Sequence, residues 1–315
     1  MSAFGFESTT DQVLEGINLA GETAVVTGAS AGLGIETSRA LASAGATVFM
    51  LGRDADKLAA AAEGVRQTLP EADIQTGIVD LADLDSVRAC ASDLGARAPE
   101  IHLLINNAGI MACPMLRTAQ GFEMQFGTNH VGHFLLTCLL VPSLKAGAPS
   151  RVVNLSSAGH RFSQMNFDDP NYEQRDYDKW QAYGQSKTCN ALFSVGLEQR
   201  LGGAGVHGIA VHPGVIMTEL SRHMDQTDFD LLLNSRPSGE DLKFKTIPQG
   251  AATSVWAAST PELEGRGALY CEDCHIAEPA QPGGEGGVED YALDTAGADK
   301  LWALSEQLVG EQFRF

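Results

Sequence analysis

Tyr183 and Lys187 are the two residues of this 315-residue chain whose type and spacing best suit proton chemistry. Because they are four positions apart on a predicted helix, their side chains lie on the same face. A free tyrosine has a pKa of about 10 and is a poor base at neutral pH, but a nearby positive charge lowers that pKa. The spacing therefore predicts a tyrosine that gives and takes a proton, tuned by a lysine. Taken alone, it also fits an ordinary pair on a helix surface.

A glycine-rich segment, residues 27–34 (TGASAGLG), directly follows a predicted strand and leads into a predicted helix. Glycines permit a tight turn and let the backbone approach a pyrophosphate, while free N–H groups at the helix start attract an anion. A plain tight turn is the alternative. The strand before and the helix after favour a dinucleotide site.

The end of the second predicted strand indicates which dinucleotide is bound. An Asp or Glu there would bind a ribose hydroxyl and repel a 2′-phosphate, but Gly52 stands at that position and Arg53 follows. A guanidinium suits bidentate phosphate binding. We therefore expect NADP(H) rather than NAD(H), and interpret the competing Asp54 as the N-cap of the next helix.

The elements that must position these residues follow from the pattern of the chain. From Thr23 onward, short β-branched runs alternate with longer alanine-rich stretches, which predicts βαβ units. We expect an α/β fold, a single doubly wound Rossmann domain over residues 1–315 with a seven-stranded parallel sheet and helices on both faces.

The predicted strands are 23–27, 47–51, 74–79, 101–106, 151–155, 206–211 and 267–270. The predicted helices are 33–44, 54–68, 84–96, 118–144, 179–201 and a C-terminal helix ending near Val309. Residues 160–178 and 220–246 lack clear periodicity and are predicted to be insertions.

Composition argues against two classes of partner. With 40 acidic and 21 basic residues, the formal net charge is -19, so the field of the protein would repel the phosphates of nucleic acids and anionic lipids. No apolar run approaches the roughly 20 residues of a membrane helix, and residues 1–12 lack the features of a signal peptide. We expect a cytoplasmic protein that acts on a small molecule, with neither nucleic acid nor membrane as partner.

Six cysteines are present, and without an export signal reduced core thiols are the expected state. Cys271-Glu-Asp-Cys274-His275 matches the haem-attachment pattern. Haem attachment needs export and a porphyrin pocket, and a metal would need another ligand. A wall of the substrate pocket or ordinary packing is therefore favoured, and no metal is expected. His130 and His133 are interpreted as packing residues rather than active-site residues.

With the glycine-rich turn, Asn106-Asn107-Ala108-Gly109 and Tyr183-Gly-Gln-Ser-Lys187, the chain resembles the short-chain dehydrogenase/reductase family over nearly its whole length. Further motifs fit the same order: Asn129, Ser157, and Pro213-Gly214 with Thr218. The segment 129–134 (NHVGHF) and the 25 residues between Ser157 and Tyr183 are similar to the retinol dehydrogenase-like branch, which includes WW-domain oxidoreductases and protochlorophyllide reductases.

The resemblance implies a role for four side chains. Tyr183 would be the acid/base, Lys187 would also hydrogen-bond the nicotinamide ribose, and Ser157 would hold the substrate oxygen. Ser156 is the alternative serine, but the family's catalytic serine is typically the second of such a pair. Asn129 would hold a water molecule of the proton relay.

The resemblance also implies the cofactor contacts, with Asp80 near the adenine. They are Gly28, Ser30, Gly32, Leu33, Gly34, Arg53, Asp80, Leu81, Asn107, Ala108, Gly109, Tyr183, Lys187, Pro213, Gly214 and Thr218. Subunits would pair through helices that include the Tyr183–Lys187 helix, as a homodimer or homotetramer.

Residues 217–246 correspond in the family to a lid over the substrate, with an apolar inner surface from Met224, Phe229, Leu231 to Leu233 and Phe244. A bulky lipophilic or aromatic substrate is the resulting hypothesis. The aromatic residues Phe162, Phe167, Tyr172, Tyr177 and Trp180 could contact it or cover the cleft. The implied activity is an NADP(H)-dependent alcohol dehydrogenase or carbonyl reductase; the alternative is a nucleotide-sensing regulator without catalysis.

Overall fold

One sheet organises the chain in the computed structural model, which describes residues 3–234, 243–282 and 286–315. Within those ranges the sheet has eight strands in the order β3-β2-β1-β4-β5-β6-β7-β8, parallel except for the antiparallel pair β7 and β8. The strands are β1 (Thr23–Thr27), β2 (Thr47–Gly52), β3 (Ile74–Ile78), β4 (Leu103–Asn106), β5 (Ser150–Leu155), β6 (Val206–His212), β7 (Leu269–Glu272) and β8 (His275–Ile276). The predicted doubly wound sheet is confirmed, with a short eighth strand added at its edge.

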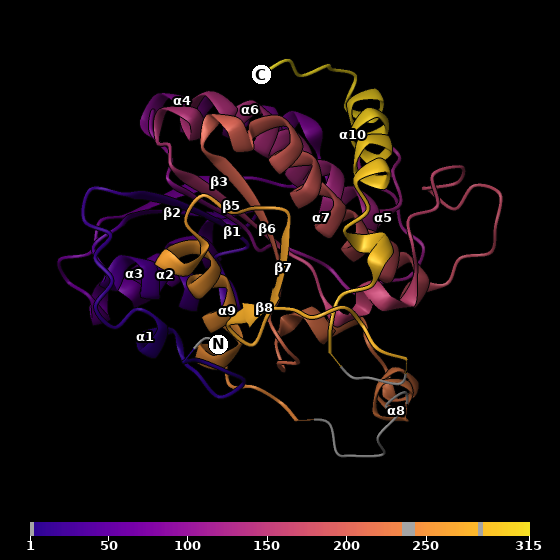
Figure 1. The fold of residues 1–315 in the computed structure, drawn as a ribbon, viewed down its shortest axis with the longest axis horizontal. Helices are drawn as coiled ribbons and strands as arrows, with labels where there is room; N and C mark the ends of the chain where they lie inside the picture. Colours follow the sequence, from indigo (N-terminus) through magenta and orange to yellow (C-terminus); the bar gives the residue numbers. More distant parts are fainter. Residues whose placement is uncertain (1–2, 235–242, 283–285) are drawn as a thin grey trace.

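Helices cover both faces of this sheet, α2, α3 and α9 on one and α4, α6 and α7 on the other (Figure 1). The α-helices of the described residues are α1 (Thr10–Val13), α2 (Gly32–Ser43), α3 (Ala55–Thr68), α4 (Leu84–Arg97), α5 (Met124–Phe126), α6 (Gly132–Ala146), α7 (Lys179–Leu201), α8 (Gln226–Asn234), α9 (Ile247–Ser259) and α10 (Thr295–Val309). None of them is long and apolar enough to cross a membrane.

Each central strand is buried on both sides, which explains its unbroken apolar sequence. Along β1, Val25 joins the core beneath α4, α6 and α7, whereas Ala24 and Val26 join the core beneath α2, α3 and α9. The strand order reverses at β1, which lies between β2 and β4. Because the connections from β1 and β4 leave in opposite directions there, a crevice opens beyond their carboxyl ends.

The predicted helix 118–144 is wrong in its first turns. Arg117 and Glu123 instead form an isolated antiparallel bridge, closed by a turn in which Gly121 has φ +86°. The helix begins at α5, where the buried Glu123 carboxylate accepts hydrogen bonds from the N–H groups of Gln125 (2.9 Å) and Phe126 (2.7 Å). It continues through a π-helical turn, η1 (Gly127–Val131), before α6. Such turns often occur at functional sites, and this one carries Asn129.

The Cys271–His275 motif is a hairpin. Asp273 and Cys274 connect β7 to β8 with φ angles of 46° and 57°, the left-handed pair that two-residue hairpin turns need. Both thiols are buried in the core beneath α9, and all six cysteines of the chain are free and buried. Within the described ranges, no group of three or more His, Cys, Asp or Glu side chains is placed to hold a metal ion.

Helix α10 covers the outer face of α7. Trp302 meets Phe134 edge-on at 5.0 Å between ring centroids, and lies so close to Gly196 of α7 that a Cβ there would be 3.0 Å from the indole. Arg200 of α7 lies 4.3 Å above the Trp302 ring and pairs with Asp299 at 3.0 Å. Helix α7, one of the helices expected to pair subunits, is therefore covered on this face by α10 of the same chain.

His130 lies at the centre of this packing, as predicted, and should make the protein sensitive to acid. Its Nε2 is 2.8 Å from the Ser305 hydroxyl, which itself donates to the Leu301 carbonyl, so Nε2 must carry the proton. Nδ1 is buried without a hydrogen-bond partner among the described residues. Burial lowers the pKa of His130 from 6.5 to about 3.

A second proton on His130 would be buried on Nδ1 without a hydrogen-bond acceptor, so the folded state disfavours the charged imidazolium. The contribution of neutral His130 to the free energy of unfolding is present in full well above pH 6.5. It decreases as the pH falls, by about 2 kcal/mol at pH 5. We expect His130→Gln, which keeps a donor for Ser305, to lose less stability than the parent protein between pH 7 and pH 5 in urea titrations. Equal losses in the two proteins would contradict this assignment.

Candidate active site

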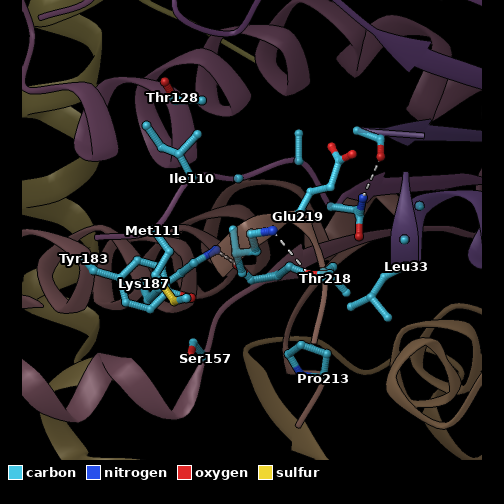
Figure 2. A pocket seen from close by; sticks show the side chains of 18 of the residues that line it. Leu33, Ile110, Met111, Thr128, Ser157, Tyr183, Lys187, Pro213, Thr218 and Glu219 are labelled. Carbon is cyan, nitrogen blue, oxygen red and sulfur yellow. Dashed lines mark hydrogen bonds between the residues drawn. The ribbon is translucent and has the colours of Figure 1, made fainter. Parts of the chain in front are cut away.

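A cavity of about 1030 Å³ opens beyond the carboxyl ends of the parallel strands. Every predicted cofactor-binding residue lines it: Gly28, Ser30, Gly32, Leu33, Gly34, Arg53, Asp80, Leu81, Asn107, Ala108, Gly109, Tyr183, Lys187, Pro213, Gly214 and Thr218. Ser157 lines it as well, whereas Asn129 does not. Figure 2 shows Ser157, Tyr183 and Lys187 on one side of the cavity and Leu33 and Thr218 on the other.

The glycine-rich turn has the shape of a phosphate cradle. Gly28 has φ +66°, and a Cβ on it would lie 2.8 Å from the Ala108 Cα. A Cβ on Gly34, at the start of α2, would overlap the Gly28 carbonyl oxygen. Larger residues are excluded at both positions, so the backbone N–H groups of the turn and of α2 stay open to an anion. The cradle therefore fits a dinucleotide pyrophosphate.

A buried hydrogen-bond chain supports this cradle from behind. Asn107 Nδ2 donates to the Thr27 carbonyl (2.7 Å), and the Ala108 N–H donates to Thr27 Oγ1 (3.0 Å). The same hydroxyl lies 2.8 Å from His133 Nε2, and His133 Nδ1 lies 3.0 Å from the Asn129 carbonyl. His133 thus links β1 to the π-helical turn, a long-range contact beyond the packing role read from the sequence.

Basic side chains gather at one end of the cavity, where the cradle meets β2. Arg53 and Lys57 line it, and Asp54 caps α3 by accepting from the Lys57 N–H at 3.0 Å, as predicted. Arg222 and His223, from the 3-10 helix η4 (Glu219–His223), line the same cavity. Sequence reasoning missed both because they belong to no motif. The three cationic side chains of Arg53, Lys57 and Arg222, in a chain of net charge -19, suit a phosphorylated ligand.

Ser157 and Tyr183 meet in the cavity. Ser157 Oγ accepts a hydrogen bond from the Gly159 N–H (3.0 Å) and is hydrogen-bonded to the Tyr183 hydroxyl. A Cβ on Gly159 would lie 2.7 Å from Tyr183 Cε1, so glycine is needed for this approach. Ser156 Oγ instead donates to the Lys187 carbonyl (2.8 Å). The geometry therefore favours the second serine of the pair.

Burial shifts the protonation equilibria of Tyr183 and Lys187. Burial raises the pKa of Tyr183 to about 12, although the hydrogen bond from Ser157 opposes this rise. Burial also lowers the pKa of Lys187 to about 7. Lys187 Nζ donates to the Leu155 carbonyl at 2.8 Å and lies 5.7 Å from the Tyr183 ring centroid. Desolvation is thus the largest influence on Tyr183 in the protein alone, and the lowering of its pKa by Lys187 together with the charge of the nicotinamide stays a prediction.

Asn129 is buried behind the cavity wall. Its Oδ1 accepts from the Ile110 N–H (2.9 Å), and its Nδ2 donates to the Ile110 carbonyl (3.0 Å) and to Ser186 Oγ (2.9 Å). The side chain therefore fastens the loop after β4 to α7, close to Lys187. Its role in a proton relay stays a prediction.

The remaining wall of the cavity is largely apolar and was mostly missed by sequence reasoning. It comprises Ile110, Met111, Cys113, Leu116, Phe162, Trp180 and Leu220. Of the aromatic insertion, only Phe162 and Trp180 face the cavity. Tyr177 lies behind it, where its hydroxyl donates to the Cys113 carbonyl at 3.1 Å.

The predicted inner surface of the lid is partly wrong. Phe244 is 47% exposed, because the chain there follows the surface toward α9. Met224 packs against the cluster that contains Trp180 and Tyr183. Leu231 to Leu233 belong to α8, but the structure describes only their backbone, so the prediction for their side chains lies outside what is described.

Comparison with known proteins gives one consistent result. The family model of short chain dehydrogenases matches residues 22–228. Retinol dehydrogenase 12 of Mus musculus is 40% identical over 297 residues, covering 94% of this chain and 89% of that protein. A crystal structure of an uncharacterized protein from Mycobacterium paratuberculosis has a TM-score of 0.74 at 36% identity, covering 95% of this chain and 97% of the other.

A complex of Pseudomonas aeruginosa RhlG with NADP has a TM-score of 0.65 at 26% identity, covering 81% of this chain and 95% of the other. The family uses NAD(P)(H) and acts on small molecules, in keeping with the cradle and the cavity. The chain belongs to the short-chain dehydrogenase/reductase family of oxidoreductases.

Proposed function

We propose that this protein is an NADP(H)-dependent alcohol dehydrogenase or carbonyl reductase that acts on CH–OH groups. The observation that carries the proposal is the meeting of Ser157 and Tyr183 in the same cavity as the phosphate cradle. Ser157 holds the substrate oxygen and Tyr183 exchanges a proton with it. Lys187 holds the ribose next to the nicotinamide. When bound, the cofactor supplies or accepts the hydride.

In the reductive direction, Tyr183 would act as the proton donor. With its pKa raised to about 12 by burial, the phenol keeps its proton at neutral pH and can donate it to the oxygen of a carbonyl substrate. Alcohol oxidation needs the phenolate, and therefore a positive charge nearby to lower that pKa. Lys187, with a pKa near 7, carries only part of that charge at neutral pH.

The apolar wall supports a bulky lipophilic or aromatic substrate. Met111 and Trp180 pack in one cluster with Tyr183, and Leu116 lines the same cavity. The retinol dehydrogenase relatives are named for a substrate of this kind. The test is consumption of NADPH and NADH against bulky aromatic ketones, aldehydes and small polar ketones. Turnover of only the small polar compounds would overturn the substrate class. Cofactor binding without any turnover would favour the nucleotide-sensing regulator instead.

Arg53 should set the preference for NADP(H). It follows β2 and lines the basic end of the cavity, where it can form charge-assisted hydrogen bonds with a 2′-phosphate. We expect Arg53→Ala to raise KM for NADPH by about 10- to 100-fold and to leave KM for NADH nearly unchanged. Arg66→Ala, on α3 but away from the cavity, is the matched control. A parent enzyme that prefers NADH would refute the assignment.

The family typically forms oligomers, and we propose a homodimer or homotetramer for this protein. Since α10 covers α7, the subunits would meet through other surfaces.

A further inference from the structure

His160 lies directly behind Ser157, in the 3-10 helix η2 (Ala158–Phe162), and is fully buried. Its Nδ1 is 2.7 Å from the Ser157 carbonyl oxygen. On the other side of the ring, Nε2 is 3.2 Å from the backbone N–H of Glu289, a residue that lines the cavity. One imidazole thus connects the serine of the site with a wall segment that is 129 positions away from His160 in sequence.

The partners of His160 fix where its proton lies. The Glu289 backbone N–H can only donate, so Nε2 must accept and carries no proton. The Ser157 carbonyl can only accept, so Nδ1 must be the donor. Both contacts require the same neutral tautomer, in which His160 donates to the main chain of Ser157.

That hydrogen bond acts on the residue whose side chain meets Tyr183. Ser157 has an extended backbone (φ -169°, ψ 157°) at the start of η2, and its hydroxyl is oriented by the Gly159 N–H. The Ala158 N–H, next along the chain, donates to His212 Nδ1 at 3.2 Å. The two imidazoles therefore hold the carbonyl and the N–H of one peptide unit, the one that joins Ser157 to Ala158.

We propose that His160 is a positioning residue that sets the place of the Ser157 hydroxyl by donating from Nδ1 to the Ser157 carbonyl. The inference rests on the proposed function, because it concerns the group that holds the substrate oxygen. His160 itself does not touch the cavity, since it is absent from its lining. It acts through Ser157 on Tyr183.

Two substitutions separate the two contacts that the ring makes with the main chain; a third contact joins Nδ1 to the Tyr270 hydroxyl at 3.2 Å. Asn places an amide near the position of Nδ1, so His160→Asn keeps a donor for Ser157 and gives up the contact with Glu289. Gln places its amide near Nε2, so His160→Gln keeps an acceptor for Glu289 and gives up the donor to Ser157. The parent enzyme and both variants are compared in kcat, KM, NADPH binding and melting temperature.

We expect kcat to fall on the order of 100-fold in His160→Gln, the cost typical of a small misplacement of a catalytic group. In His160→Asn it should stay within about threefold, and NADPH binding should be unchanged in both variants. A second readout is the pH profile of alcohol oxidation. The hydrogen bond from Ser157 lowers the pKa of Tyr183. The rising limb of the pH profile should therefore move to higher pH in His160→Gln and stay in place in His160→Asn.

The charged and titratable groups around His160 are the same in both variants and serve as an internal control. They are Arg161, paired with Glu289, together with Tyr270, Tyr291 and His212. Equal losses of kcat in the two variants, with unmoved pH profiles, would overturn the inference and leave the proposed function intact. A parent enzyme that binds NADPH but turns over no substrate would overturn both.

Discussion

Tyr183→Phe should lose about 10²- to 10⁴-fold in kcat while NADPH binding is retained. The substitution removes only the hydroxyl that exchanges a proton with the substrate oxygen. The ring remains in its place against Gly159 and Trp180, so the cavity keeps its shape. Steady-state kinetics with the best carbonyl substrate, together with a fluorescence titration of NADPH, would measure the two effects separately.

Tyr172→Phe is the matched control for this experiment. Tyr172 is also buried, but its hydroxyl has no hydrogen-bond partner among the described residues and does not line the cavity. Arg175 lies 3.6 Å from the centroid of its ring, a contact that phenylalanine preserves. This variant should keep its activity. If Tyr183→Phe also stayed within about threefold of the parent enzyme, the proton chemistry assigned here would be wrong.

Gly34→Ala should weaken NADPH binding on the order of 100-fold, although it adds a single methyl group. That methyl would overlap the Gly28 carbonyl oxygen and lie 2.8 Å from Asn107 Nδ2. Helix α2 would have to move away from the turn, and its N-terminal N–H groups would move with it. Calorimetric titration with NADPH would measure the loss of affinity, and thermal unfolding would show how much of the damage is structural.

Gly95→Ala provides the comparison on another helix. Gly95 lies within α4, and a Cβ there would meet nothing within 4 Å. Alanine should raise stability by up to about 1 kcal/mol through its helix propensity and leave NADPH affinity unchanged. Parent-like NADPH affinity in Gly34→Ala would show that the cradle does not depend on this close approach.

The sequence was most informative where the structure depends on neighbours along the chain. The strand at 23–27 and the helix at 179–201 were predicted with the bounds that the structure gives them, because periodicity and a motif agree there. The predicted cofactor contacts, all of which line the cavity, come from motifs at the carboxyl ends of parallel strands, which meet at one edge of the sheet.

Two helices show where local reading failed. The apolar pattern of 118–144 concealed the N-cap at Glu123. Its carboxylate accepts hydrogen bonds from the first N–H groups of α5, so the helix begins there and not at residue 118. Helix α9 was not predicted, although Thr246 and Gln249 form a capping box and Pro248 stands in its first turn. Those signals were present in the sequence and could have found the helix.

Contacts between distant segments were beyond the reach of sequence reasoning. Nothing local in the chain says that Glu289 meets His160, or that His133 meets Thr27. The same limit applies to the proton equilibrium of Tyr183, because its burial depends on several elements packed together. The sequence identified Tyr183 and Lys187 as candidates, but it could not predict the desolvation that shifts their pKa values.

The cover that α10 places over α7 ties the C-terminal part of the chain to the helix that carries Tyr183 and Lys187. A chain that completes the surroundings of its own Tyr183–Lys187 helix does not need a second copy to hold that helix in shape. Trp302 and Asp299 of α10 both contact Arg200 of α7, and Trp302 also meets Phe134 of α6. A change in the C-terminal helix would therefore loosen the packing of the helix that carries Tyr183 and Lys187 within a single chain.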